Sequence, residues 1–293
     1  METMKRWQWA FLLAGILVFG GCIGASNRPP DKTSDVDGNQ TKAGSSSDSN
    51  STTPRDWSSA ENTPVRPGST LGQGEDEIGR ERPYCTTNFI FRDPQNARLF
   101  VGTAAHCVEG VEPGEPIELA EGRVDGVLSY SGWWDEANGT TDSSHGYDFA
   151  LVAIPKAHWE QVHPSLKGWE GPVGLAQPDE LATGDMLHWF GNSSDRQDVD
   201  HLQRNRGVFC EDAALETPTH LFFFRGLGPA IPGDSGSPVV TADGEALGVL
   251  VGASAGPCPG AVAPERAVAL KAALDQAAQR GMNVELVTDP GET

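Results

Sequence analysis

The chain has 293 residues, of which 38% are hydrophobic, and its formal net charge is −20. That length allows two average domains or one larger domain with two lobes. The negative charge argues against sequence-independent binding of nucleic acid and against attraction to an anionic membrane surface. A solvated acidic surface and an adaptation to high salt both fit this charge.

The first 21 residues are typical of an export signal. Lys5 and Arg6 supply a positive start, and residues 10–21 are uncharged and mostly apolar. Such a segment is short for a membrane-spanning helix. We therefore expect residues 1–21 to be a signal peptide and the rest of the chain to be exported.

Cys22 directly follows this signal. Residues 19–22, Phe-Gly-Gly-Cys, resemble the lipobox of prokaryotic lipoproteins, although Phe19 stands where leucine is usual. In that family the cysteine is lipidated and becomes the mature N-terminus. The resemblance implies a lipid anchor on Cys22 as the only attachment to a membrane. A plain signal peptide and an uncleaved anchor are the alternatives.

From Cys22 to residue 73 the chain is rich in Ser, Thr, Asp, Asn, Pro and Gly and has almost no periodic apolar pattern. This composition cannot bury enough surface to offset the entropy of ordering, so we expect residues 22–73 to form a disordered linker. A flexible coil of about 50 residues spans roughly 40 Å. A removable pro-segment is the alternative. The folded domain is expected over residues 74–293.

Within that domain the apolar runs are short, β-branched or aromatic, and separated by Gly, Pro and Asp, which is typical of strands. A first group of expected strands covers residues 86–91, 98–102, 116–119, 124–130 and 148–154. A second group covers residues 186–190, 207–210, 221–225, 238–241 and 246–251. Many short strands without helices between them indicate a barrel or a sandwich.

Two local signals add to the second group of strands. Asp243-Gly244 predicts a hairpin turn between its last two members. Residues 264–280 place Ala, Leu and Val on one face and end at Gly281, so they predict one helix.

Residues 233–238 read Gly-Asp-Ser-Gly-Ser-Pro. Glycines on both sides of a serine allow a tight turn that exposes the Ser235 hydroxyl and leaves nearby backbone N–H groups free. This arrangement suits the nucleophile of an acyl transfer. The same residues also form ordinary turns, so the motif alone favours a turn.

A nucleophilic serine needs a base and an acid that orients the base. His106 lies in residues 103–107, Thr-Ala-Ala-His-Cys, directly after an expected strand. Asp148 leads another strand whose neighbours are apolar, so its carboxylate can be partly buried. Asp135 and Asp142 compete with it from a polar loop. The remaining histidines show no metal-ligand spacing.

The three segments resemble, in the order His, Asp, Ser, the motifs of the chymotrypsin/trypsin-like serine proteases. The resemblance implies an all-β fold of two six-stranded antiparallel barrels with a C-terminal helix. It makes His106 the general base, Asp148 its orienting partner and Ser235 the nucleophile. The N–H groups of Gly233 and Ser235 would form the oxyanion hole. Substrate would lie in the cleft between the barrels, and no cofactor or metal is required.

Apart from Cys22, the chain has four cysteines, at positions 85, 107, 210 and 258. Four cysteines allow three sets of disulfides, so the choice among these sets depends on the resemblance. In the family, the cysteine after the histidine is bridged to one on the preceding strand, which implies a Cys85–Cys107 bond. Cys210 and Cys258 would then form the second bond. Such bonds require an oxidising compartment.

The specificity pocket is where the chain departs from the family. Trypsin has an aspartate six residues before its serine, whereas this chain has Pro229, so no fixed negative charge is evident there. Val251-Gly252-Ala253 align with the strand that receives the substrate backbone, where the family has Ser-Trp-Gly. Glutamyl-specific relatives have a histidine where this chain has Leu250. These differences favour a small or apolar side chain before the cut.

The sequence thus predicts an exported, monomeric serine endopeptidase that acts on protein or peptide substrates and does not bind nucleic acid. A lipase or esterase is disfavoured, because its elbow would need glycine at position 237, which is serine here. A protease-like fold that has lost activity and binds a partner at the cell envelope is the alternative from another functional class.

Overall fold

A computed structural model of the chain describes residues 63–72, 85–144, 146–167, 169–193, 204–212, 220–254, 256, 258–261 and 263–289. All of them belong to one compact unit, Pro54–Thr293. The expected signal peptide, Cys22 and most of the expected linker lie outside the described residues. Within those residues, every helix is too short or too polar to cross a membrane.

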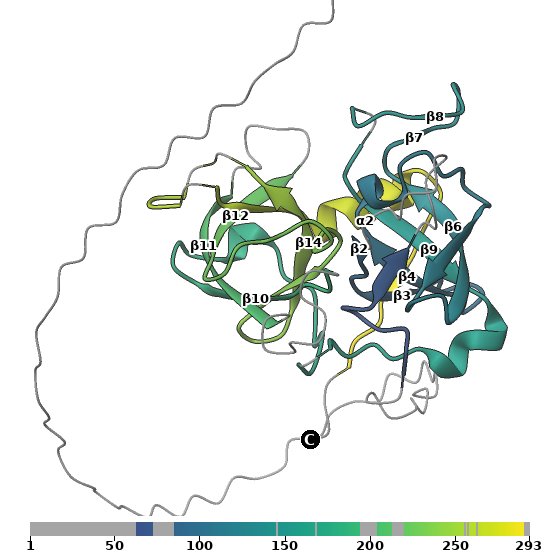
Figure 1. The fold of residues 1–293 in the computed structure, drawn as a ribbon, viewed down its shortest axis with the longest axis horizontal. Coiled ribbons are helices and arrows are strands. Elements are labelled where there is room, and N and C mark those ends of the chain that lie inside the picture. The colour runs from purple at the N-terminus through teal and green to yellow at the C-terminus, as the bar shows by residue number, and fades with distance from the viewer. Residues whose placement is uncertain are drawn as a thin grey trace, which may run out of the picture. The chain divides into compact units, whose positions relative to one another are not determined.

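The first lobe is a half-barrel formed by one eight-stranded antiparallel sheet (Figure 1). Along the sheet the strand order is β16-β3-β4-β9-β6-β5-β1-β2. Its strands are β1 (Thr70–Gly72), β2 (Cys85–Thr86), β3 (Ile90–Arg92), β4 (Leu99–Thr103), β5 (Pro116–Leu119), β6 (Val124–Ser131), β9 (Ala150–Ile154) and β16 (Glu285–Leu286). In the described part of the chain its end strands β16 and β2 do not pair, so the first barrel is open where a closed six-stranded barrel was expected.

The folded domain begins earlier than the boundary expected at residue 74. Strand β1 pairs with β2 on one side and with β5 on the other, and Val65 forms a bridge with Val162. Residues 63–72 were placed in the linker because they lack an apolar alternation. The sheet holds them through backbone hydrogen bonds, which composition does not reveal.

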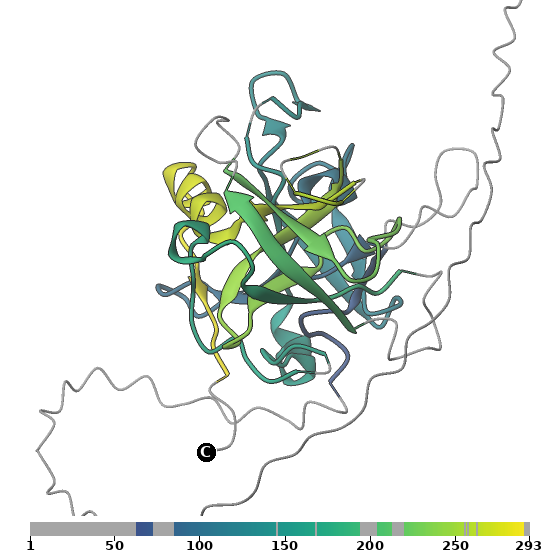
Figure 2. The same cartoon turned by 90° about the vertical axis from the view of Figure 1, so that its left-hand side faces the viewer.

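The second lobe is a closed six-stranded barrel, as expected, and Figure 2 views the molecule from its side. Its strand order is β10-β11-β12-β15-β14-β13. The strands are β10 (Met186–Phe190), β11 (Arg204–Asp212), β12 (Leu221–Gly226), β13 (Pro238–Thr241), β14 (Ala246–Ala253) and β15 (Glu265–Ala269). The predicted turn at Asp243-Gly244 joins β13 to β14, and Gly244 has the positive φ of 83° that such turns need.

The C-terminal helix is shorter than predicted. Helix α2 (Leu270–Gln279) is followed by Gly281 with φ of 83°, but residues 265–269 form strand β15 instead of the first helical turns. This stretch pairs with β12 and with β14, and its pairing closes the barrel. Barrel closure therefore overrides the helix propensity of an alanine-rich segment.

Elsewhere the apolar runs form the two cores. Phe89, Phe100 and Phe149 are fully buried in the first lobe, and Trp189 and Phe222 are fully buried in the barrel. Short 3₁₀ turns interrupt the chain at Ala105–Val108, Lys156–Gln161 and Pro178–Glu180, and a small hairpin is made by β7 (Trp134–Asp135) and β8 (Thr140–Thr141). The helix lies between the lobes in Figure 1.

Candidate active site

The pairing of β4 with β9 brings His106 and Asp148 together. Thr103, at the end of β4, is paired with Ala150, at the start of β9. His106 follows the first strand by three residues and Asp148 precedes the second by two. Antiparallel neighbours end and begin at the same edge of a sheet, so the two side chains meet there.

Two hydrogen bonds hold this pair. His106 Nδ1 lies 2.8 Å from Asp148 Oδ2, and the backbone N–H of His106 donates to Asp148 Oδ1 at 2.9 Å. The side chains are 28% and 15% exposed, respectively, so the pair is partly shielded from water. With the Nδ1 proton donated to the carboxylate, Nε2 is left as the ring's acceptor.

The competing aspartates take part in local turns of the β7–β8 hairpin region. Asp135 Oδ1 accepts from the N–H of Ala137, and Asp142 Oδ1 accepts from the N–H of Ser144. These bonds are typical of aspartates that stabilise turns. Asp148, in contrast, accepts a hydrogen bond from His106 at each of its carboxylate oxygens.

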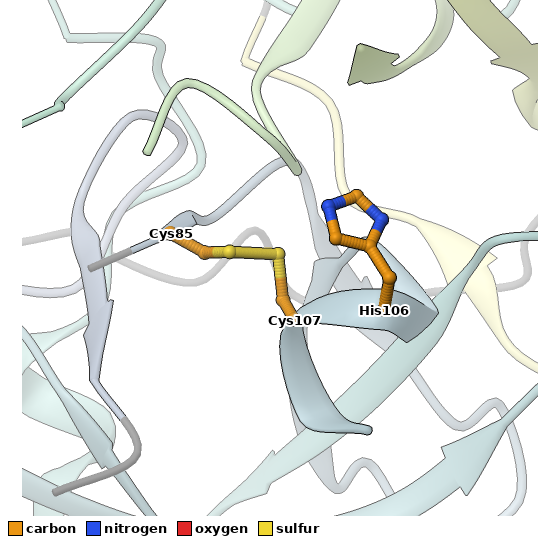
Figure 3. A group of neighbouring side chains, drawn as sticks. All are labelled: Cys85, His106 and Cys107. Atoms are coloured by element: carbon orange, nitrogen blue, oxygen red, sulfur yellow. A yellow bond between two sulfur atoms is a disulfide. The ribbon is translucent and has the colours of Figure 1, made fainter. Parts of the chain in front are cut away.

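Both implied disulfides are confirmed. Cys85 is bonded to Cys107, and Cys210 is bonded to Cys258. Figure 3 shows the first bond beside the His106 ring. Although Cys85, His106 and Cys107 place their possible ligand atoms within 4.8 Å of one another, both sulfurs are already bonded to each other and offer no thiolate to a metal.

The serine loop has the backbone conformation that its glycines permit. Gly233 has φ of 96° and Gly236 has φ of 88°. Among the described residues, the N–H groups of Gly233 and Ser235 donate no hydrogen bond within the chain, whereas the intervening Asp234 N–H donates to Ile231 O at 3.0 Å. Two N–H groups without intramolecular acceptors are the donors that an oxyanion hole requires.

Strand β2 and strand β14 fix this loop from opposite sides. The N–H of Thr86 donates to Ser235 O at 2.8 Å, and its Oγ1 donates to Gly233 O at 2.9 Å. On the other side, Gly236 N–H donates to Leu250 O at 2.7 Å. An added Cβ at Gly236 would lie 2.1 Å from Thr86 O, so this position admits only glycine.

The disulfide places the serine loop next to the histidine. Cys107, the neighbour of His106, has its Sγ 3.7 Å from Ser235 O. Strand β2 therefore connects to both halves of the site, through Cys85 to the histidine turn and through Thr86 to the serine loop. In the described part of the chain, no hydrogen bond joins the Ser235 hydroxyl to His106. Such bonds are often long in free enzymes and shorten with substrate.

Asp234 has a structural role in the loop. Its side chain is fully buried, and its Oδ2 accepts from the N–H of Ile231 at 2.9 Å. Its carbonyl oxygen accepts from the Ser237 hydroxyl at 2.5 Å. A Cβ at Gly191 would lie 2.1 Å from Asp234 Oδ1, so the carboxylate packs directly on the backbone that follows β10.

A negative charge does lie beside Pro229, contrary to the sequence expectation. Glu265 is 4% exposed, and its carboxylate accepts from the N–H of Gly226 at 2.6 Å and from that of Ala230 at 3.3 Å. Pro229 itself is exposed, between β12 and β13. The carboxylate thus holds the segment that leads into the serine loop. Sequence reasoning missed Glu265 because it assigned this residue to the helix.

Val251, Gly252 and Ala253 form the end of β14, directly after the residue that binds the serine loop. A cavity of about 330 Å³ lies between His106 and the Val251 end of β14. It is lined by His106, Trp133, Ser143, Gly146, Asp148, Leu221, Val251, Arg266 and Val268. The ring centroids of Trp133 and His106 are 6.1 Å apart. Of the residues expected to bind substrate, only Val251 lines this cavity.

Helix α2 binds the backbone next to Asp148 through the side chain of Gln276. The Gln276 side-chain oxygen accepts from the N–H of Tyr147 at 2.9 Å and from the Tyr130 hydroxyl at 3.4 Å. Burial raises the pKa of Tyr130 to about 12, so this hydroxyl stays protonated and able to donate. Because Tyr147 precedes Asp148, Gln276 fixes the backbone from which the aspartate projects. No local sequence signal points to a glutamine so far along the chain.

The fold and the sequence lead to one family. Residues 89–249, more than half of the chain, match the trypsin-like peptidase domain family. No curated protein matches the chain. The first of the solved structures described below shares the fold, and two others are similar to the chain at lower TM-scores; the sequence identity to each is too low to show more than a fold.

The first is a glutamic-acid-specific serine protease, with 16% identity, a TM-score of 0.50, and coverage of 76% of this chain and 100% of that one. The second is Nocardiopsis protease, with 16% identity, a TM-score of 0.45 and coverage of 76% and 98%. The third is the Rv3671c protease from M. tuberculosis in its active form, with 18% identity, a TM-score of 0.46 and coverage of 73% and 81%. The chain belongs to the trypsin-like peptidase family.

Proposed function

We propose that this chain is a serine endopeptidase that cleaves peptide bonds through His106, Asp148 and Ser235. The observation that carries the proposal is the His106–Asp148 pair, with 2.8 Å between Nδ1 and Oδ2, next to a serine loop whose Gly233 and Ser235 N–H groups have no acceptor among the described residues. Together these supply an oriented base and oxyanion donors.

In the proposed first half-reaction, Ser235 Oγ attacks the carbonyl carbon of the scissile bond while His106 Nε2 takes the hydroxyl proton. The negative charge that develops on the carbonyl oxygen is stabilised by the N–H groups of Gly233 and Ser235. The bond between carbon and nitrogen then breaks, and His106 gives its proton to the leaving amine. The product of this half is an ester between the substrate acyl group and Ser235.

In the second half-reaction a water molecule repeats the attack. His106 takes a proton from the water, the resulting hydroxide adds to the ester carbon, and Ser235 leaves as its hydroxyl after receiving that proton. Throughout, Asp148 holds the ring by accepting at Oδ2 and stabilises its charged form. The residues described here perform every proton transfer.

The cellular setting is part of the proposal and follows from the sequence. We infer an exported monomer, attached to a membrane by lipid on Cys22, that acts on protein or peptide substrates. Two disulfides within the folded domain fit an oxidising compartment. Metabolic labelling with a fatty acid analogue tests the anchor, since Cys22→Ala should remove the label.

Hydrolysis of a peptide library by the disulfide-intact full chain tests the activity. Ser235→Ala and His106→Ala are expected to reduce kcat/KM to background. Asp148→Asn is expected to reduce it by about 10³- to 10⁴-fold, the size known for replacement of a triad aspartate. If wild type and Ser235→Ala are equally inactive while both are folded, the proposal fails and an inactive binding module becomes the better interpretation.

A further inference from the structure

Within the described part of the chain, one permanent cation, that of Arg266, lies in the cavity beside His106 and Asp148. Arg266 lines this cavity together with both residues. Its Nε is buried and has no hydrogen-bond partner, and no carboxylate within the described residues forms an ion pair with its guanidinium. Arg266 as a whole is half-buried, but a buried side-chain nitrogen without a hydrogen-bond partner is unusual, because buried polar atoms in folded proteins are nearly always paired.

The register of β15 explains why the side chain reaches the cavity. Arg266 is paired with Gly252 of β14, whereas its neighbour Glu265 is paired with Ala253. A Cβ at Gly252 would lie 3.8 Å from Arg266 Nε, so the arginine passes over the bare backbone of this glycine. Successive side chains of a strand point to opposite faces, and the Glu265 carboxylate accordingly binds the Ala230 segment instead.

Few groups that line the cavity would compete with a bound carboxylate for the Arg266 guanidinium. Among its lining residues, Val251, Leu221 and Val268 are apolar. Asp148 is the one acidic residue among the described residues that line the cavity, and both of its oxygens accept hydrogen bonds from His106. Apolar walls strengthen an ionic hydrogen bond, and a guanidinium fork matches a carboxylate in shape.

We propose that Arg266 binds a substrate carboxylate, the side chain of a glutamate or aspartate close to the scissile bond. The inference rests on the proposed peptidase function and adds a substrate class to it. The carboxylate would lie against the end of β14, within reach of the Arg266 N–H donors and beside His106. Arg266 is thus a specificity-determining residue and takes no part in the proton transfers.

A pair of matched peptide sets tests this assignment on the disulfide-intact full chain. In one set a single glutamate occupies each of the four positions before the cut in turn, and in the other set glutamine replaces it. Wild type is expected to show a kcat/KM about 10- to 100-fold higher for glutamate at one position. Arg266→Gln should remove this preference, and Arg266→Glu should reverse it. The exposed Arg98, outside the cavity, provides the control variant Arg98→Gln, which should keep the preference.

Binding separates this inference from the proposed function. Fluorescence anisotropy with Ser235→Ala is expected to show tighter binding of the preferred glutamate peptide than of its glutamine match, with the difference lost in the Ser235→Ala/Arg266→Gln double variant. If wild type cleaves both sets equally, or if the binding difference is absent or survives in the double variant, the Arg266 assignment is overturned. Binding with the expected difference but without cleavage would support the Arg266 assignment and count against the peptidase.

Discussion

The two halves of the candidate site are held in different ways. His106 and Asp148 lie next to the ends of two paired strands of one sheet, β4 and β9, and bond directly to each other. The serine loop belongs to the second lobe, and two of the hydrogen bonds that hold its backbone come from the N–H and the hydroxyl of Thr86, in β2 of the first lobe. The first half therefore depends on local pairing, whereas the second depends on contacts between lobes.

This difference indicates where the site is most sensitive to substitution. Replacement of a residue far from His106 in the first sheet can leave its bond to Asp148 intact. The serine loop depends in addition on a close fit with the first lobe, because a Cβ at Gly236 would lie 2.1 Å from Thr86 O. We therefore expect variants at the contact between β2 and the loop to lose more activity than stability.

The largest effect is expected for Gly236→Ala. A Cβ there would lie 2.1 Å from Thr86 O and 2.5 Å from Thr103 Oγ1, at a φ of 88°. We expect loss of peptide hydrolysis and a decrease of about 3 kcal/mol in the free energy of unfolding. Gly244→Ala is the matched control, because its φ is 83° but its nearest contact is 3.9 Å away. Equal activities of the two variants would contradict the close fit.

Thr86→Val is expected to have the second-largest effect, a decrease in kcat/KM of about tenfold. The change removes the hydroxyl that donates to Gly233 O and accepts from Asn192 N–H. Thr87→Val is the control, because the Thr87 hydroxyl is equally buried but bonds to Arg66 and Ser69. Both variants should lose stability, and only Thr86→Val should lose activity per folded molecule. A similar loss in both would show that β2 does not position the loop.

Gln276→Leu tests the other half and should have a smaller effect, a several-fold decrease in kcat. The variant leaves the Tyr147 N–H without its acceptor next to Asp148. A fully buried donor without an acceptor costs about 1–3 kcal/mol in stability, and the partly buried Tyr147 N–H should cost about 1 kcal/mol. Gln276→Glu retains an acceptor oxygen and should restore kcat. If both variants have wild-type kcat, the helix does not position the aspartate.

The smallest effect is expected for His188, in barrel strand β10, which should make the free energy of unfolding depend on pH. Burial, and then the nearby Arg206 charge, lower the pKa of His188 below its ordinary value of 6.5. Protonation therefore favours the unfolded chain, so the free energy of unfolding should decrease as pH falls below about 6.5. His188→Leu should make this decrease shallower in denaturant titrations between pH 7 and pH 5. If the free energy of unfolding has the same pH dependence in wild type and variant, His188 does not contribute to the loss of stability at low pH.

Several features could be predicted from the sequence because short motifs determine them. The histidine turn, the glycines beside Ser235 and the strand behind Asp148 are local signals, and the family resemblance implied both disulfides. Nine of the ten expected strands appear, three with the expected ends and six with shifted ends, while the segment 86–91 is divided into β2 and β3. Alternation of apolar residues determines which segments become strands but leaves their ends uncertain by a few residues.

The missed features depend on contacts between distant residues. Thr86 binds Gly233 across 147 positions of sequence, and Gln276 binds Tyr147 across 129. The roles of Glu265 and Arg266 were missed because the alanines that follow them favour a helix. Barrel closure instead makes this segment a strand, in which the two side chains point to opposite faces. The negative charge near Pro229 and the cation near His106 follow from that one change.

The central claim is that Ser235 is a nucleophile activated by His106 and Asp148. Its most direct test is reaction of the folded, disulfide-intact full chain with a fluorophosphonate, followed by mass spectrometry to locate the adduct. We predict one adduct at Ser235 that is lost in Ser235→Ala and in His106→Ala. A folded wild-type chain without an adduct at Ser235, or with an adduct that forms equally fast in His106→Ala, would contradict the claim.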